Sequence, residues 1–206
     1  MDRDENDTTI RVVAISGSLR TGSYTTMALK IALDESAKAG AETHFIDLRD
    51  YDLVFAGSKS KTAVPGVVRL AEEVRRADGI LLGTPEYHGS FSGVLKNALD
   101  LMGFDEFEGK MIGLVGVSAG HMGAFDALNS LRNVGRALHA WVVPEQVSLP
   151  DASSHFDEQG RLKNPELEQR LRQLGRRVAD FARLHKGGRA TEFVETWEGA
   201  MENPGG

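Results

Sequence analysis

The stretch IRVVAISGSLRTGSYTT, from Ile10 to Thr26, joins a short apolar run to a loop of glycines and hydroxyl-bearing residues. The run Ile10–Ile15 is rich in β-branched residues, as expected of a strand buried on both faces of a parallel sheet. Behind the loop, Ser23–Lys38 has helical periodicity and is followed by Gly40, a residue type common at helix C-termini. The stretch therefore predicts a strand, a turn and a helix, the opening of a βαβ unit.

Four more apolar runs of this kind follow along the chain: Ala41–Ile46, Gly79–Gly83, Met111–Val117 and Trp141–Val147. Amphipathic stretches separate them, with a helix opening at Pro65, one capped by Ser92, one carrying a leucine stripe from Phe125 to Leu138, and one from Asn164 to Phe181. The alternation predicts an α/β, flavodoxin-like, doubly wound five-stranded parallel sheet of order 2-1-3-4-5 with helices on both faces. The sequence alone does not separate this order from a Rossmann arrangement.

Composition narrows the class of protein. The 206 residues fit a single domain over 1–206, with a core of about 10–185, a polar start and a C-terminal extension at 187–206. The net charge of −6, with no basic stripe, predicts no nucleic-acid partner. With no cysteine, redox chemistry needs a bound cofactor. No membrane span or signal peptide is recognisable, so we expect a cytoplasmic protein.

The extension has one pattern of its own. Phe193, Trp197 and Met201 are four residues apart, so a short helix there would carry one apolar stripe. The stripe would pack either on its own domain or on a neighbouring subunit.

Ligands of doubly wound sheets bind at the carboxyl ends of the strands. The loop after the first strand, Ser16–Thr26, combines hydroxyls, glycines and Arg20 ahead of a helix. Helix N-terminal amides, hydroxyls and a guanidinium are the donors that a phosphate monoester requires. The loop matches neither the Walker pattern nor GxGxxG, which favours a lone phosphate over a dinucleotide; a merely polar turn is the alternative.

Two further loops have suitable residues. Gly83–Gly93, after the third strand, could place backbone N–H groups along the edge of a flat heterocycle, where a reduced flavin accumulates negative charge. Ser118–Gly123, after the fourth strand, contains Gly120 and Gly123, which allow a close approach to a ring, although many strand-to-helix turns are rich in glycine.

The pairing of SGSLRTGSY with PEYHGSFSGVLKNALD resembles the NADPH-dependent FMN reductase family, which includes chromate- and quinone-reducing members, from Ile10 to about Phe181. The resemblance implies FMN as cofactor, NADPH or NADH as hydride donor, and a homodimer or homotetramer with cofactor sites near a subunit interface. It assigns the FMN phosphate to Ser16, Ser18, Arg20, Ser23 and Thr25, and the isoalloxazine to Pro85, Glu86, Tyr87, His88 and Gly89, with Ser118 and Gly120 closing the pocket. Tyr24 and Tyr87 are candidates for stacking on the flavin or for the pocket wall.

The sequence departs from the family pattern at two positions. His88 follows Glu86-Tyr87 where the family usually has Asn, and Thr25 stands where another Asn often follows the aromatic residue of the first loop. Thr25 keeps a hydroxyl, whereas His88 brings a larger ring that can become charged and serves either as a structural rim residue or as a flavin hydrogen-bonding group.

The expected activity is hydride transfer from NAD(P)H to flavin and then to a small acceptor: free FMN, a quinone, an azo compound or chromate. This cycle requires no catalytic side chain and no metal, and the scattered histidines show no HExxH spacing. Glu86 is expected to fix its loop by accepting a backbone N–H. A flavodoxin-like electron carrier without NAD(P)H turnover is the first alternative, and a phosphate-ligand sensor the second.

Overall fold

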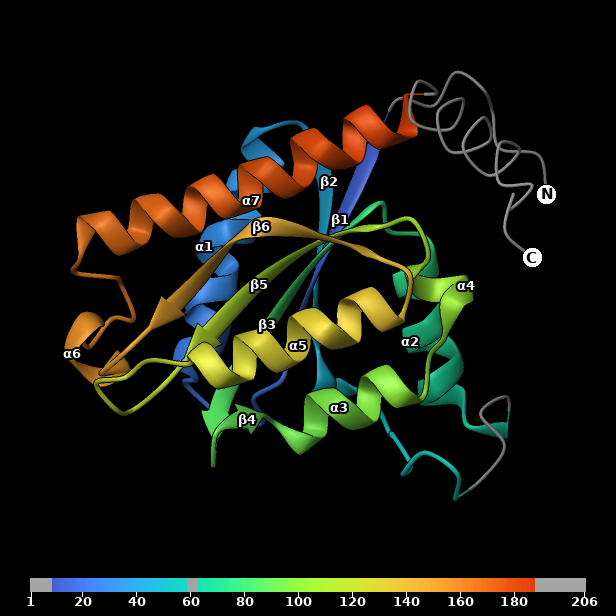
Figure 1. The fold of residues 1–206 in the computed structure, drawn as a ribbon, viewed down its shortest axis with the longest axis horizontal. Helices are drawn as coiled ribbons and strands as arrows, with labels where there is room; N and C mark the ends of the chain where they lie inside the picture. The colour runs from blue at the N-terminus through green and yellow to red at the C-terminus, as the bar shows by residue number, and fades with distance from the viewer. Residues whose placement is uncertain (1–8, 59–62, 188–206) are drawn as a thin grey trace, which may run out of the picture.

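A computed structural model describes residues 9–58 and 63–187 (Figure 1). Within these residues, the five parallel strands are β1 (Ile10–Ser16), β2 (Ala41–Asp47), β3 (Gly79–Tyr87), β5 (Met111–Val117) and β6 (Trp141–Leu149). They lie in the order β2-β1-β3-β5-β6. Counted along the chain, this is the predicted order 2-1-3-4-5, so the flavodoxin-like arrangement is confirmed and the Rossmann order is excluded.

One strand was not predicted. β4 (Ser90–Phe91) pairs antiparallel with the end of β3, which continues past Gly83 to Tyr87. Pro85, Glu86 and Tyr87 were predicted in a loop and instead lie in a strand. The β3 extension forms because it pairs with β5 on one side, where Pro85 lies opposite Val117, and Glu86 lies opposite Phe91 of β4.

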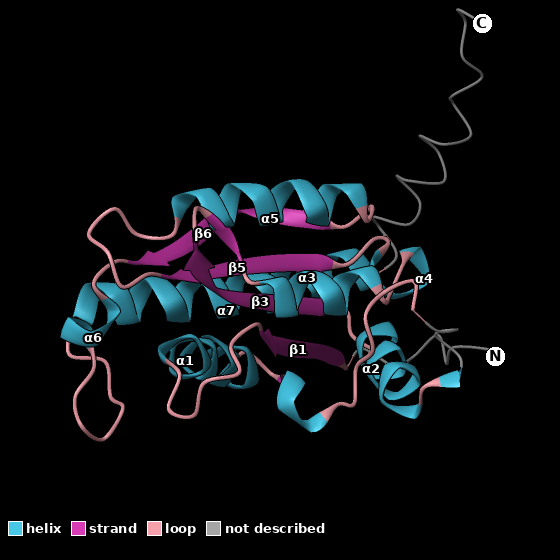
Figure 2. Ribbon diagram, turned by 90° about the horizontal axis from the view of Figure 1, so that it is seen from below, coloured by secondary structure: helices cyan, strands magenta, loops and turns pink. Residues whose placement is uncertain are grey.

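Helices cover both faces of the sheet. α1 (Tyr24–Lys38) and α7 (Pro165–Lys186) pack on one face, and α2 (Pro65–Arg75), α3 (Gly93–Asp100) and α5 (Phe125–Ala137) on the other. Figure 2 shows α5 running along β5 and β6. Val12 and Ala14 of β1 are buried under the first pair of helices, and Val13 and Ile15 under the other three. This two-sided burial explains why the strand sequence is apolar throughout.

Helix ends follow the local signals in the sequence. The Ser92 side chain caps α3 by accepting the Leu95 N–H, and Asn164 accepts two N–H groups at the start of α7. Pro65 occupies the first turn of α2, as predicted. Three short elements were not predicted: η1 (Leu48–Asp50), α4 (Phe104–Phe107) and α6 (Ala152–His155). They are too short for a periodic signal.

Among the helices of the described residues, none is long and apolar enough to cross a bilayer. The stripe of Phe193, Trp197 and Met201 lies outside the described residues.

The contact between α1 and α7 is unusually close. A Cβ built on Gly175 would lie 1.8 Å from the carbonyl oxygen of Ala32, which leaves no room for any side chain. The Ser36 hydroxyl of α1 donates a hydrogen bond of 2.8 Å to the Gly175 carbonyl across the same contact. Gly175 therefore fixes the distance between the two helices that cover one face of the sheet.

We predict that Gly175→Ala lowers the free energy of unfolding by about 3 kcal/mol, because the helices must separate or shift to admit the methyl group. Urea denaturation measures this change. Gly93→Ala is the matched control, since a Cβ on Gly93 meets no heavy atom within 4 Å, and its effect is expected to stay within about 1 kcal/mol. Equal stability of the two variants would contradict the close-contact argument.

Candidate flavin site

Three loops meet at the carboxyl edge of the sheet. Ser16, the last residue of β1, lies beside Gly83 of β3, and Pro85 lies beside Val117 at the end of β5. The loops that leave these strands therefore emerge next to one another. The structure thus brings together the predicted segments Ser16–Thr26, Gly83–Gly93 and Ser118–Gly123.

The first loop is fastened to the second by its backbone. The Gly17 N–H donates to the Gly83 carbonyl at 2.8 Å, and the Ser92 hydroxyl donates to the Gly17 carbonyl at 2.6 Å. A Cβ on Gly17 would lie 2.9 Å from both the Leu95 Cβ and the Ser92 Oγ. Only glycine fits this crossing, which fixes the position of the hydroxyl-rich loop relative to α3.

The hydroxyls of the first loop are buried within it. Ser16, Ser18, Ser23 and Thr25 all have little exposed surface. The Ser16 Oγ lies 3.0 Å from the Thr26 Oγ1, a residue that the sequence analysis did not select. Thr26 reaches back to the strand end because it lies on the first turn of α1, three residues after Ser23. That spacing is the only sequence signal that could have identified it.

The start of α1 is rich in uncompensated donors. Ser23 occupies the N-cap position but, in the described part of the chain, makes no side-chain capping bond, and the first turn has no acidic residue. No carboxylate among the described residues forms an ion pair with Arg20, whose guanidinium lies 6.0 Å from the centre of the exposed Tyr87 ring. Free amides and an unpaired guanidinium at a helix N-terminus form an environment suited to an anion.

A second arginine, Arg49, reaches this loop from η1, directly after β2. Arg49 Nη1 donates to the Thr21 Oγ1 at 3.5 Å, and its guanidinium is also bonded to Asp47, the residue opposite Ser16 on β2. The hydrogen bonds from Arg49 hold the pKa of the Asp47 carboxyl below its usual value. The Asp47 carboxylate therefore lies beside the loop with its charge balanced by Arg49. Sequence reasoning missed Arg49 because its approach depends on strand pairing.

The second segment is fixed by Glu86. Its Oε2 accepts the Ala127 N–H at 3.0 Å, so the carboxylate binds the first turn of α5. The expectation that Glu86 accepts a backbone N–H is met, but the donor belongs to α5 rather than to its own loop. The contact secures β3 against α5 and offsets the positive end of that helix.

His88 and Gly89 form the two-residue connection between Tyr87 and Ser90, with φ of +52° and +75°. Positive φ at both central residues is the type I′ hairpin turn, whose preferred sequence is Asn-Gly. An Asn at this position, as in the family pattern, would therefore have a backbone advantage in the turn. His88 adopts the same conformation without that advantage, and its side chain is exposed.

The third loop is tied to the end of β6. The Ser118 Oγ accepts the Gly120 N–H at 3.0 Å, and the Gly120 carbonyl accepts the Asp151 N–H at 3.2 Å. Gly123 has a φ of +75°, which leads the chain into α5. Ser118 and Gly120 thus belong to a loop with a defined path.

Tyr24, which the sequence analysis also selected, stacks on Phe156 with ring centroids 5.1 Å apart.

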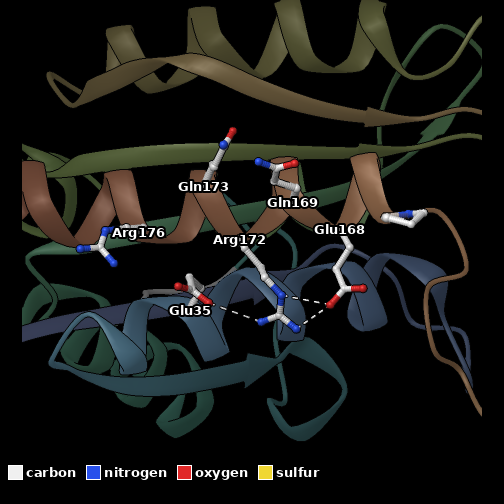
Figure 3. Close-up of a pocket in the computed structure, with 7 residues that line it drawn as sticks. Glu35, Glu168, Gln169, Arg172, Gln173 and Arg176 are labelled. Carbon is white, nitrogen blue, oxygen red and sulfur yellow. Dashed lines mark hydrogen bonds and ion pairs between the residues drawn. The ribbon is translucent and has the colours of Figure 1, made fainter.

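A different hollow lies between α1 and α7, away from these loops (Figure 3). In it the Arg172 guanidinium is bonded to Glu168 and Glu35. Glu35 lies on the last turn of α1, about 16 Å along the helix from its start at 1.5 Å per residue. The charge of Arg172 is already balanced by the two glutamates, so this hollow is poorly suited to binding an anion.

The sequence comparison then decides the family. A model of the NADPH-dependent FMN reductases matches residues 10–154. The chain belongs to this family. It is 33% identical to an FMN-dependent NADPH-azoreductase of Staphylococcus saprophyticus, over 82% of this chain and 93% of that protein. It is 36% identical to an NAD(P)H-dependent FMN reductase of Pseudomonas aeruginosa, over 80% of this chain and 90% of that protein.

The comparison with solved structures shows a shared fold. The structure of a flavoenzyme NAD(P)H:(acceptor) oxidoreductase of Paracoccus denitrificans superimposes with a TM-score of 0.70 at 23% identity, covering 86% of this chain and 99% of that one. As a member of the NADPH-dependent FMN reductase family, the protein is an oxidoreductase that uses FMN and NAD(P)H. The electron-carrier alternative finds no support in these comparisons.

The donors on the first loop fit the family's cofactor. The α1 N-terminus, the buried hydroxyls and the unpaired Arg20 match a phosphate monoester in charge and in hydrogen-bonding type. The match rests on the chemistry of these groups in this chain and not on the family name.

We predict that His88→Asn raises the free energy of unfolding by about 0.5 kcal/mol, because Asn tolerates the left-handed conformation better than His does. Chemical denaturation of the FMN-free protein isolates this backbone effect from cofactor binding. His88→Ala provides the control, since Ala has no such tolerance and is expected to give no gain. A destabilised Asn variant would show that the His88 ring supports the hairpin.

Proposed function

We propose that the three loops at the carboxyl edge hold FMN, and that the protein uses NAD(P)H to reduce a planar aromatic acceptor there. The observation that carries this assignment is the uncapped start of α1 beside the unpaired Arg20. An anion at that position would satisfy donors that the chain itself leaves unused.

Each segment has its own part in the proposal. The phosphate group is assigned to Ser16, Ser18, Arg20, Ser23 and Thr25, now joined by Thr26. The ring is assigned to Pro85, Glu86, Tyr87, His88 and Gly89, with Ser118 and Gly120 on its other side. Tyr24, at the start of α1, is assigned to the wall of the site. Glu86 acts through its bond to α5, which sets the position of the strand end.

Bound FMN supplies the capacity to accept a hydride and pass it on. The chain's own task is then to bind, orient and exclude water rather than to attack the substrate. In the ranges that the structure describes, no group of three or more metal-ligating side chains is present.

The rim of the site favours aromatic acceptors. Four large apolar side chains are exposed: Leu19, Tyr87 and Met122 on the three segments, and Phe125 at the start of α5. Burying this apolar surface against a flat apolar molecule is favourable. A small oxyanion would bury little apolar surface there and would gain less binding free energy. We therefore place quinones, azo compounds and free flavins ahead of chromate.

The same exposed rim supports an assembly. We include in the proposal a homodimer or homotetramer whose subunits meet near the site. We also propose that the protein works in the cytoplasm, where NAD(P)H is available, and that it has no nucleic-acid partner. Sedimentation velocity on the full chain is expected to give two or four times the mass of one chain. A single species with the mass of one chain would remove the assembly from the proposal.

We predict that Ser18→Ala combined with Arg20→Ala weakens FMN binding by about 100-fold, because each removed group forms a hydrogen bond to a charged phosphate. Quenching of flavin fluorescence on titration measures the affinity. The matched control is Arg176→Ala, an exposed arginine on α7 beside the hollow of Figure 3, which is expected to leave the affinity unchanged. Unchanged FMN affinity in the double variant would overturn the assignment of the phosphate to this loop.

Steady-state oxidation of NADPH and NADH by the FMN-loaded protein, with a quinone as acceptor, tests the activity itself. Sustained turnover supports the proposal. Tight FMN binding without turnover would restore the electron-carrier alternative, and absence of FMN binding would favour the phosphate-ligand sensor.

A further inference from the structure

The loop after β5 carries a histidine–carboxylate contact to which the assignment of the FMN site gives no role. His121 Nδ1 lies 2.5 Å from Asp151 Oδ2, and the His121 side chain is 93% exposed. Asp151 belongs to the turn between β6 and α6, so the pair joins two segments at the carboxyl edge. His121 directly follows Gly120, one of the residues assigned to the ring site.

The Asp151 carboxylate contacts His121 although the backbone at this position would favour glycine. Asp151 has a φ of +42°, in the left-handed region, where glycine would be free of strain. It also occupies the N-cap position of α6, yet its carboxylate makes no capping bond within the described residues and instead contacts His121. The turn does not need this contact for its attachment, because the Asp151 N–H already bonds to the Gly120 carbonyl.

A pocket adjoins the pair. It lies between the β5 loop, the end of β6 and the start of α7, with a volume of about 330 Å³. Met122, Phe125 and Leu167 supply apolar surface, and His155, Glu166 and Arg170 are the titratable or charged groups on the neighbouring elements that line it. The pocket is therefore amphipathic, which suits an aromatic molecule with polar substituents.

Resting on the proposed function, we propose that His121, oriented by Asp151, is a catalytic proton donor to the acceptor during its two-electron reduction. A quinone or azo acceptor that takes a hydride equivalent becomes an anion on oxygen or nitrogen and needs one proton to form a neutral product. A positioned acid at that atom removes the cost of the developing charge.

The proton balance is simple. The Nε2–H bond of the His121 imidazolium breaks, its electron pair stays on Nε2, and a new O–H or N–H bond forms on the acceptor. The neutral ring that remains keeps its hydrogen on Nδ1, where the Asp151 carboxylate accepts it. Water then returns a proton to the exposed Nε2. Asp151 is a positioning residue, since it acts only through His121.

The test compares two acceptors on the FMN-loaded full chain. Menadione requires a proton for each hydride equivalent, whereas ferricyanide accepts electrons alone. We expect His121→Gln to lower kcat with menadione by about 100-fold, the low end of general-acid catalysis, with KM unchanged and the ferricyanide rate within about twofold of the original. The matched control is His44→Gln, an exposed histidine paired with Glu73 on the β2 side of the fold, which is expected to change neither rate.

A second variant separates orientation from folding. Asp151→Gly relieves the left-handed strain and removes the carboxylate, so the melting temperature should be kept while the menadione rate falls. Nitrogen-15 NMR of the FMN-free protein supplies a readout independent of turnover: the His121 ring should be protonated at Nδ1 in the original protein and should lose this tautomer preference in Asp151→Gly.

Equal losses with both acceptors, no loss with menadione, or an original His121 ring protonated only at Nε2 would each overturn the inference while leaving the reductase activity intact. Absence of any NAD(P)H oxidation by the unaltered protein would instead overturn the proposed function, and the inference with it.

Discussion

The backbone crossing at Gly17 is the constraint on which the rest of the site depends. The Gly17 amide bonds to the Gly83 carbonyl, and the Gly17 carbonyl accepts the Ser92 hydroxyl, so one residue joins the end of β1 to Gly83 of β3 and to the start of α3. The room for this crossing exists only because Gly17 has no side chain. A longer separation would carry the hydroxyls of the first loop away from the β3 hairpin, and no single ligand could then contact both.

The charged groups near the Gly17 crossing fall into two sets, those with a partner and those without one among the described residues. Three carboxylates near the edge are bound to partners: Asp47 to Arg49, Glu86 to the first turn of α5, and Asp151 to His121. Arg20 and the amides of α1 have no such partner among the described residues. The edge therefore keeps these donors available for a ligand, while the three paired carboxylates serve to position strands, helices and loops. The same division explains how a protein with a net charge of −6 can present a site for an anionic cofactor.

Local signals in the sequence were reliable wherever a residue acts on its immediate neighbours. Ser92 and Asn164 cap helices that begin one residue later, and Pro65 opens a helix whose first N–H needs no partner. The continuous apolar runs of β1, β3 and β5 predicted burial on both faces, which the layers confirm, whereas the edge strands β2 and β6 are partly exposed. The segment Pro85–Tyr87 was misjudged because a proline and polar residues are typical of loops. Pairing with β5 and with β4 made it a strand.

By itself, the sequence determined the alternation of strands and helices, the three chemically distinctive loops and the family to which they point, because these depend on residue type and spacing over a few turns of chain. The tertiary structure decided which distant groups meet: Thr26 with Ser16, Arg49 with Thr21, and His121 with Asp151. It also decided that His88 occupies a left-handed turn. Such contacts arise from strand order and from the close approach of glycine backbones, and neither leaves a periodic trace in a single sequence.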